Sequence, residues 1–231
     1  MLADLHSSYY GEKQIELISE IQKLDFDLIF LAGDIVDDKV SLERGFDTIR
    51  YIKDKTKKPI YYVTGNHDGY IDYMYNVKEH IKNMGVNVLE GNDLDIDIFG
   101  NNINILGYDD RTIGIDLYYK ELDDLKESIK DLKEDSLKLL ISHRPEKHEE
   151  YEELKADYVF SGHAHGGQWK TKKGKTGMYA PGQGMFPKYV DGLYKRGTYS
   201  HIITPGLARD NTKVPRIFNP PCIMHIKFSS I

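Results

Sequence analysis

The chain has 231 residues, of which 40% are hydrophobic and 29% charged, and these proportions are typical of a soluble globular protein. No stretch reaches the ~18 uninterrupted apolar residues that a membrane-spanning helix needs. The net charge of -6 disfavours binding to a nucleic-acid backbone, and the single cysteine, Cys222, excludes an intramolecular disulfide. The length suits a single domain, which we expect to span residues 1–231 of a cytoplasmic protein.

Two hydrophobic patterns alternate along the first two-thirds of the chain and predict an α/β fold. Apolar residues recur at helical spacing in residues 15–24, 42–55 and 120–135. Short apolar or β-rich runs, which are typical of strands, lie at residues 28–31, 60–63, 137–141, 158–160 and 222–228. The stretch 176–197 is rich in glycine, proline and tyrosine, and we interpret it as a long active-site loop.

The beginning of the chain departs from this pattern, because only Met1, Leu2 and Ala3 precede the first acidic cluster. Either the chain begins late, or another element occupies that edge of the sheet. In the first case an upstream anchor could attach a longer form of the protein to a membrane.

Polar clusters follow the predicted strands, and they contain the side-chain types that bind borderline divalent cations. In layered α/β folds ligands collect beyond the carboxyl ends of the strands, so we expect these clusters to converge. Taken alone, Asp4 and His6 are equally well interpreted as surface polar residues. The full set of seven suits two metal ions: Asp4, His6, Asp34, Asn66, His143, His163 and His165.

The order of these clusters resembles the calcineurin-like metallophosphoesterase superfamily. The motifs are D-x-H, G-D, G-N-H-D, a lone histidine after a strand, and G-H-x-H, and they span residues 4–165. The resemblance implies a four-layer αββα sandwich of two mixed β-sheets, with an apparently truncated first strand. It also implies hydrolysis of a phosphate ester by in-line attack of a hydroxide held between two metal ions.

The resemblance implies a role for each of the clustered residues. One metal ion is assigned to Asp4, His6, Asp34 and His165. Asp34 then bridges to a second ion, which is assigned to Asn66, His143 and His163. His67 remains as a candidate catalytic acid, and Asp68 is expected to orient its imidazole. The mixture of ligands favours manganese or iron, with zinc or cobalt as further candidates.

The C-terminal third resembles, less specifically, a bacterial branch of the superfamily whose members are often membrane-associated phosphodiesterases. The likeness rests on residues 166–168, 186–189 and 215–221. It favours a phosphodiester or a lipid-linked phosphate ester as the substrate, whereas nucleic acid is disfavoured by the overall charge. The competing interpretations are a nuclease with the same metal core and a phosphoesterase-like scaffold with little catalytic power.

Other polar residues carry weaker signals. Arg144 directly follows His143, and it either contacts a substrate phosphate or forms a surface salt bridge. We interpret three histidines outside the motifs as structural, and a fourth is left unassigned. The three are His80, His148 and His225, and the fourth is His201.

Overall fold

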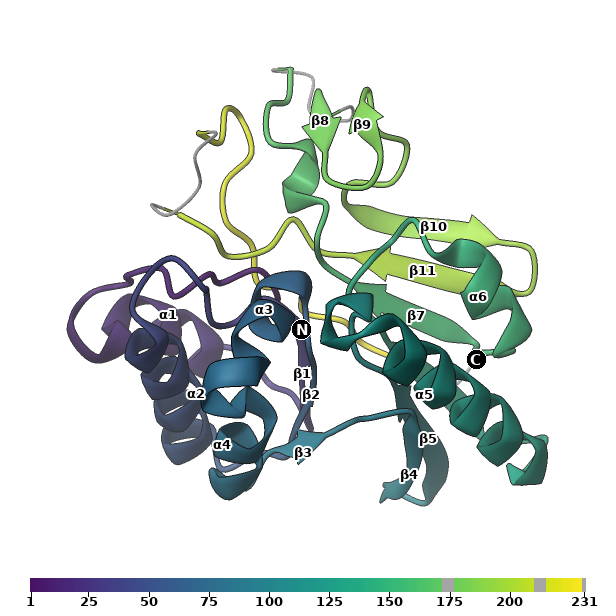
Figure 1. Ribbon diagram of the computed structural model, residues 1–231. Helices are drawn as coiled ribbons and strands as arrows, with labels where there is room; N and C mark the ends of the chain where they lie inside the picture. Colours follow the sequence, from purple (N-terminus) through teal and green to yellow (C-terminus); the bar gives the residue numbers. More distant parts are fainter. Residues whose placement is uncertain (172–176, 210–214, 230–231) are drawn as a thin grey trace.

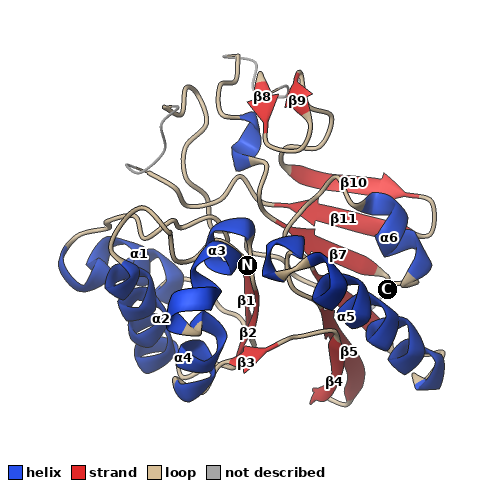
Figure 2. Ribbon diagram, in the orientation of Figure 1, coloured by secondary structure: helices blue, strands red, loops and turns tan. Residues whose placement is uncertain are grey.

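The protein is described by a computed structural model, which covers residues 1–171, 177–209 and 215–229, and only the backbone of residues 72–75. Two β-sheets face each other, and helices cover the outer face of each sheet (Figures 1 and 2). The predicted four-layer αββα sandwich is therefore confirmed. No helix among the described residues is long and apolar enough to cross a membrane.

The smaller sheet has three parallel strands in the order β1-β2-β3, and four α-helices lie on its outer side. The strands are β1 (Ile29–Ala32), β2 (Ile60–Val63) and β3 (Asn87–Val88). The helices are α1 (Ile15–Gln22), preceded by the 3-10 turn η1 (Glu12–Gln14), α2 (Leu42–Thr56), α3 (Asn66–Tyr75) and α4 (Val77–Asn83). Every residue of β1 and β2 is buried, which is why these segments have continuous apolar runs and no alternation.

The larger sheet is mixed and has six strands in the order β10-β11-β7-β6-β5-β4, with both edge strands antiparallel to their neighbours. The strands are β4 (Asn92–Ile98), β5 (Asn101–Gly107), β6 (Leu137–Ile141), β7 (Tyr158–Ser161), β10 (Gly192–Arg196) and β11 (Tyr199–Ile203). Its outer face carries α5 (Ile115–Ser128) and α6 (His148–Glu153). The 3-10 turns η2 (Arg111–Ile113) and η3 (Ile129–Asp131) flank α5, and η4 (His165–Gly167) follows β7.

The core between the two sheets is apolar. Phe30 of the smaller sheet packs edge-on against Phe160 of the larger sheet, with ring centroids 5.0 Å apart. The outer faces of the sheets bury two further apolar clusters beneath the helices, including Leu122 and Leu125 of α5. The predicted core-facing side of residues 120–135 is thus confirmed.

The stretch 176–197 is not the predicted long loop. Residue 176 lies outside the described residues, and the rest contains the hairpin β8 (Tyr179–Ala180) and β9 (Gly184–Met185), followed by β10. The glycines that suggested a loop instead lie in the hairpin turn (Gly182) and at the first residue of β9 and of β10 (Gly184 and Gly192), and all three have positive φ.

The short beginning of the chain acts as a strand beside β1. Leu2 pairs with Leu31 in parallel, and the Asp4 N–H donates to the Gly33 carbonyl at 3.0 Å. On its other side, Met1 and Met224 exchange both backbone hydrogen bonds, as an antiparallel pair does. The predicted strand 222–228 is otherwise irregular. A cavity of about 900 Å³ adjoins this pairing, between the sheets.

A buried cluster of charges braces the loop that follows β2. The Lys78 ammonium lies 2.8 Å from Asp109 and 2.7 Å from Glu90. Asp109 accepts a hydrogen bond from the Thr64 N–H, and its own N–H donates to Glu121 of α5. Burial, and then the negative charge of Asp109, raise the pKa of Glu121 from 4.5 to about 7. Ionisation of Glu121 therefore lowers the free energy of unfolding.

Replacing Glu121 with glutamine should stabilise the protein at alkaline pH and much less at acidic pH. Because the pKa of Glu121 is raised on folding, its stabilising contribution is complete below pH 4.5 and is lost as the pH rises through about 7. We expect the Glu121→Gln variant to gain on the order of 2 kcal/mol over the wild type across this window. Melting temperatures at about pH 5 and pH 8 measure the gap. Glu127→Gln, an exposed position on the same helix, is the control, and an equal gap at both pH values would contradict the assignment.

Candidate metal centre

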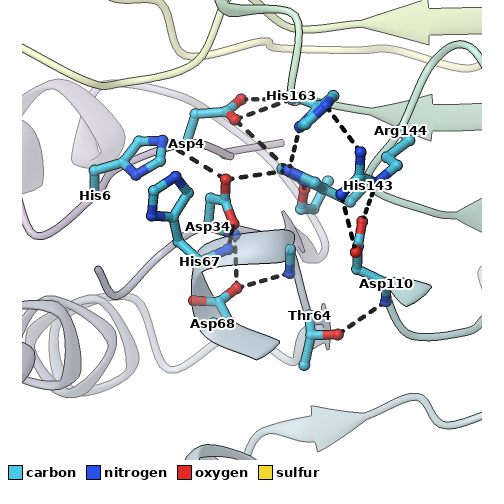
Figure 3. A network of polar contacts seen from close by, with 12 residues as sticks. Asp4, His6, Asp34, Thr64, His67, Asp68, Asp110, His143, Arg144 and His163 are labelled. Carbon is cyan, nitrogen blue, oxygen red and sulfur yellow. Dashed lines mark hydrogen bonds and ion pairs between the residues drawn. The ribbon is translucent and has the colours of Figure 1, made fainter. Parts of the chain in front are cut away.

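The carboxyl ends of β1, β2, β6 and β7 meet at one edge of the sandwich. Figure 3 shows several predicted ligands close together there, namely Asp4, His6, Asp34, His143 and His163. Six of the predicted ligands form two compact groups in which the candidate ligand atoms lie within 4.8 Å of one another. The first group is Asp4, His6 and His165, and the second is Asp34, His143 and His163. Each group contains three of the four residues that the resemblance assigned to one metal ion; the predicted sets also include Asp34 in the first and Asn66 in the second.

Asp34 belongs to the second group and also lies close to His6 of the first. Its Oδ2 is 3.2 Å from Nε2 of His143 and 3.7 Å from Nε2 of His6. Its Oδ1 accepts a hydrogen bond from the His67 N–H at 2.8 Å. The carboxylate is almost completely buried, so it depends on these partners in place of water. Imidazoles of both groups therefore lie around the Asp34 carboxylate.

Hydrogen bonds fix which imidazole nitrogens face the centre. Nδ1 of His143 lies 2.8 Å from the Ala32 carbonyl, and it must carry the proton because a carbonyl only accepts. Nδ1 of His6 lies 2.8 Å from the Asp37 carboxylate. In both rings Nε2 is then available, which is the usual arrangement when a second partner orients a metal-binding histidine.

The seventh predicted residue, Asn66, begins α3 beside these groups. Its side-chain oxygen is buried and has no hydrogen-bond partner among the described residues. A buried carboxamide oxygen without a partner is costly, so it needs a donor or a cation. Together with the facing imidazoles, this oxygen shows that the donor set fits a divalent metal ion.

The buried charges also shift the proton affinities of the histidines. Burial lowers the pKa of His143, but Asp34 and Asp4 outweigh it and raise this pKa to about 10. Burial likewise works to raise the pKa of Asp34, yet His143 and His6 hold it well below its usual value. Burial and neighbouring positive charge lower the pKa of His163 and His165, which therefore stay neutral. Neutral imidazoles are the form that binds metal.

The backbone at the centre is strained. Five of the seven candidate ligands have φ between 46° and 63°, a left-handed conformation that side chains other than glycine seldom adopt. They are Asp4, His6, Asp34, His163 and His165. Such conformations persist only where surrounding contacts hold them, and they concentrate at functional sites.

Glycines allow the strand ends that carry the candidate ligands to lie close to one another. A Cβ atom on Gly33 would lie 2.5 Å from Nδ1 of His143, and one on Gly162 would lie 2.5 Å from the Asp4 carboxylate. The same carboxylate accepts the His163 N–H at 2.9 and 3.0 Å. Both G-D and G-H-x-H motifs thus need their glycine for steric reasons.

Asp68 has a different position from the one predicted. Its carboxylate accepts three backbone N–H groups, from Asp34 at 2.6 Å, Gly65 at 2.8 Å and Val36 at 3.0 Å. It therefore ties the loop after β1 to the loop after β2. Burial, and then the charge of Asp34, raise the pKa of Asp68 to about 6.

The His67 ring is oriented by two other acidic residues. Its Nδ1 lies 2.6 Å from Asp38 and 3.4 Å from Asp37, both on the loop after β1. Nδ1 of His67 is thereby engaged with carboxylates, while the ring stays partly exposed. Sequence reasoning missed both carboxylates, although the run Gly33-Asp34-Ile35-Val36-Asp37-Asp38 placed them close to a predicted ligand.

Arg144 lies beside the second group. Its side chain is not exposed, and the salt bridge that it forms is not a simple surface one. Its Nε and Nη2 hold Asp110 at 2.5 and 3.2 Å, while Nη1 is 3.4 Å from Nε2 of His163. Glu146 is also close, with its Oε1 3.7 Å from Nε2 of His163. Asp110 and Glu146 gave no signal in the sequence, because neither belongs to a recognised motif.

The remaining histidines lie outside the centre. His201 is completely buried against Ser161, with Nε2 2.9 Å from the hydroxyl, and burial lowers its pKa to about 3. His80 packs on Phe46, and Nε2 of His225 lies 2.9 Å from the Asp25 carbonyl. His148 starts α6. By contrast, Asn219 of the C-terminal run donates to the His165 carbonyl at 2.7 Å and so supports the centre.

The position of Asp68 predicts that this residue stabilises the structure and does not take part in acid catalysis. In an Asp68→Asn variant the amide NH₂ would face a backbone N–H, so at least one of the three hydrogen bonds would be lost. We expect the free energy of unfolding to fall by about 1–3 kcal/mol, measured by urea denaturation in the presence of chelator. His67→Gln is the control and should leave stability unchanged. Unaltered stability in Asp68→Asn, with only turnover reduced, would instead support the role predicted from the sequence.

Comparisons with known proteins agree with this geometry. Residues 1–167 match the calcineurin-like phosphoesterase family. The chain is 30% identical over 220 residues to the uncharacterized protein YpbG of Bacillus subtilis, covering 93% of this chain and 73% of that protein. It is 27% identical over 227 residues to the uncharacterized metallophosphoesterase YkoQ of the same organism, covering 97% and 81%.

A solved structure shares the fold at low sequence identity. It is the phosphopantetheinyl hydrolase of Mycobacterium tuberculosis, with a TM-score of 0.55, 12% identity, and coverage of 89% of this chain and 88% of that chain. The chain therefore belongs to the calcineurin-like phosphoesterase family and is a metal-dependent phosphoester hydrolase.

Proposed function

We propose that the centre holds two divalent metal ions and that the protein is a phosphodiesterase. One ion would be held by Asp4, His6, Asp34 and His165, and the other by Asp34, Asn66, His143 and His163. The observation that carries this proposal is the pairing of imidazole nitrogens across each group. Nε2 of His6 is 3.3 Å from Nε2 of His165, and Nε2 of His143 is 3.2 Å from Nδ1 of His163.

Bound there, two such ions would supply an acidified water and neutralise the charge of the phosphate. The nitrogen and oxygen donors favour manganese or iron over magnesium or calcium, and zinc or cobalt would also fit. The protein's own part is to hold Asp34 between the groups and to exclude water from the buried histidines.

His67 is proposed to protonate the leaving oxygen of the ester. Its backbone N–H is fixed on Asp34, and its ring is fixed by Asp38, so Nε2 is held in one direction at the edge of the centre. A positioned acid of this kind accelerates a reaction typically ~10²- to 10⁴-fold. Arg144 is proposed to contact a phosphate oxygen through Nη1, since its other two nitrogens are occupied by Asp110.

The preference for a diester is supported by the likeness of the C-terminal run to the phosphodiesterase branch, since Asn219 of that run contacts the centre. We also propose that residues 1–231 act as one domain, because both halves contribute to the core between the sheets. A small-molecule or lipid-linked ester is the proposed substrate class.

Hydrolysis of bis-p-nitrophenyl phosphate and p-nitrophenyl phosphate tests the proposal. The protein is first stripped with chelator and then supplied in turn with manganese, iron, zinc, cobalt or magnesium. We expect a transition metal to restore activity, and we expect higher kcat/KM for the diester. Asp34→Ala should abolish turnover, and Asp123→Ala, the same change at an exposed position of α5, should not.

Two outcomes would overturn parts of this proposal. If the protein binds two equivalents of metal but hydrolyses neither ester, the scaffold interpretation would be favoured. Faster cleavage of single-stranded DNA than of either ester would favour the nuclease.

The role of His67 is tested with leaving groups of different quality. We expect His67→Gln to lower kcat ~10²- to 10⁴-fold for a phenyl ester, whose leaving oxygen needs a proton. The loss should be much smaller for the p-nitrophenyl ester, because p-nitrophenolate leaves readily without one. Metal content should be unchanged, and Asp38→Asn should show the same pattern with a smaller loss. An equal loss for both esters would exclude His67 as the acid.

A further inference from the structure

Glu146, on the loop after β6, lies between the metal centre and the β8–β9 hairpin. Its Oε1 is 3.7 Å from Nε2 of His163 and 3.7 Å from Nη1 of Arg144. Only 19% of its side chain is exposed, and its Oε2 is buried without a hydrogen-bond partner among the described residues. A carboxylate that has lost most of its water needs donors or positive charge in its place. Glu146 therefore depends on its two neighbours at the centre.

The two nitrogens of the His163 ring face different neighbours (Figure 3). Nδ1 lies 3.2 Å from Nε2 of His143, and both residues belong to the second group of candidate ligands. Nε2 lies 3.4 Å from Nη1 of Arg144. His163 is only 4% exposed, so neither nitrogen can rely on water. Each nitrogen must find its partner within the protein or in a bound ion.

The neighbours of His163 decide which nitrogen carries the ring proton when a metal ion is bound. Because Nδ1 faces the second group, it is the nitrogen placed to bind an ion, and the proton of the neutral ring then lies on Nε2. Arg144 cannot accept a hydrogen bond from Nε2, since a guanidinium has only donors, whereas a carboxylate has only acceptors. The distance of 3.7 Å to Glu146 is roughly 0.7 Å longer than an N–H···O bond, and rotation of the carboxylate can close this gap.

We propose that Glu146 is a positioning residue for the second metal ion, because it accepts a hydrogen bond from Nε2 of His163 and so directs Nδ1 toward the ion. This inference rests on the proposed two-metal function. A carboxylate behind a metal-binding imidazole fixes the orientation of the ring and makes it a stronger ligand. Since Glu146 is then the partner of Nε2, Nη1 of Arg144 stays available for a phosphate oxygen of the substrate.

The turn of the β8–β9 hairpin holds Glu146 in this position. Gly182 has a φ of 72°, and a Cβ atom on this residue would clash with Oε1 of Glu146. Any side chain there would therefore push the carboxylate away from His163. Gly184 has a similar φ of 73°, but a Cβ atom on it would meet nothing within 4 Å. The two glycines thus separate the contact with Glu146 from the effect of backbone strain.

Metal titration of chelator-stripped protein tests the proposal without measuring turnover. Co²⁺ alone is titrated by calorimetry, and its visible absorption reports the ligands around the ion. We expect Glu146→Ala to weaken the binding of one of two equivalents ~10- to 100-fold and to change its absorption. The weakened equivalent should be the one that Asn66→Ala also weakens. Glu146→Gln should keep most of the affinity, because its amide oxygen can still accept a hydrogen bond from Nε2 of His163.

The glycine pair provides the matched comparison. Gly182→Ala should weaken the same equivalent as Glu146→Ala, whereas Gly184→Ala should leave both equivalents unchanged. In the Glu146→Ala background, Gly182→Ala should cause no further loss, because the carboxylate that it displaces is already absent. Melting curves in the presence of chelator check that each variant is folded. If Glu146→Ala does not fold, the comparison of the two glycine variants decides the matter.

The outcomes separate this proposal from the proposed function. If Glu146→Ala binds both equivalents as tightly as the wild type, or if Gly182→Ala and Gly184→Ala lose affinity equally, the role of Glu146 is excluded and the two-metal hydrolase is unaffected. If the wild type binds no ion that Asn66→Ala weakens, both proposals are wrong. If two ions bind and respond to the variants as expected, but neither ester is hydrolysed, the role of Glu146 is supported and only the phosphodiesterase is overturned.

Discussion

The centre depends on one buried carboxylate, Asp34, held between imidazoles at the point where the strands of both sheets end. Its burial makes it strongly dependent on neighbouring donors, and His143 and His6 meet that need from opposite sides. Removing the imidazoles would leave a charge with almost no water around it. The loops after β1 and β6 are therefore linked by electrostatics at their tips, in addition to the packing of their strands.

The surrounding contacts hold this arrangement in place against its own strain. Asp68 accepts the Asp34 N–H and the Gly65 N–H, so one side chain sets the distance between two loops. Asp4 does the same between the N-terminal segment and the loop after β7. Five candidate ligands can keep a left-handed backbone conformation because several hydrogen bonds hold the surrounding loops in place. A metal ion entering this centre would meet donors that are already in position, which lowers the cost of binding.

Two peripheral segments lie beside the metal centre. The β8–β9 hairpin and the C-terminal run carry exposed apolar side chains, among them Phe186 and Phe218. Glu146 and Asn219 connect the two regions, since each contacts both a peripheral segment and the turn that carries His163 and His165.

The sequence by itself determined the fold class and the residues that gather at the centre, because motif order and the strand-then-polar pattern are local features. Asp34, Asn66, His143 and His163 each follow an apolar run, and parallel strands bring such positions to one edge. It could not show that Asp68 ties backbone loops while Asp38 orients His67, since both are acidic residues near the same motifs. Only three-dimensional contacts separate these roles.

Tertiary structure also decided what the glycine-rich stretch becomes. The composition of this stretch is compatible with a loop. Its strands form because Phe186 pairs with Met178 and Trp169 pairs with Ile217, and these partners lie up to ~50 positions apart in the sequence. Arg144 shows the same limit, because its choice between substrate and salt bridge depends on Asp110, which the chain brings from a different strand end. The local sequence pattern predicts the strands and the polar residues that follow them. Which of those side chains contact one another depends on pairing between distant parts of the chain.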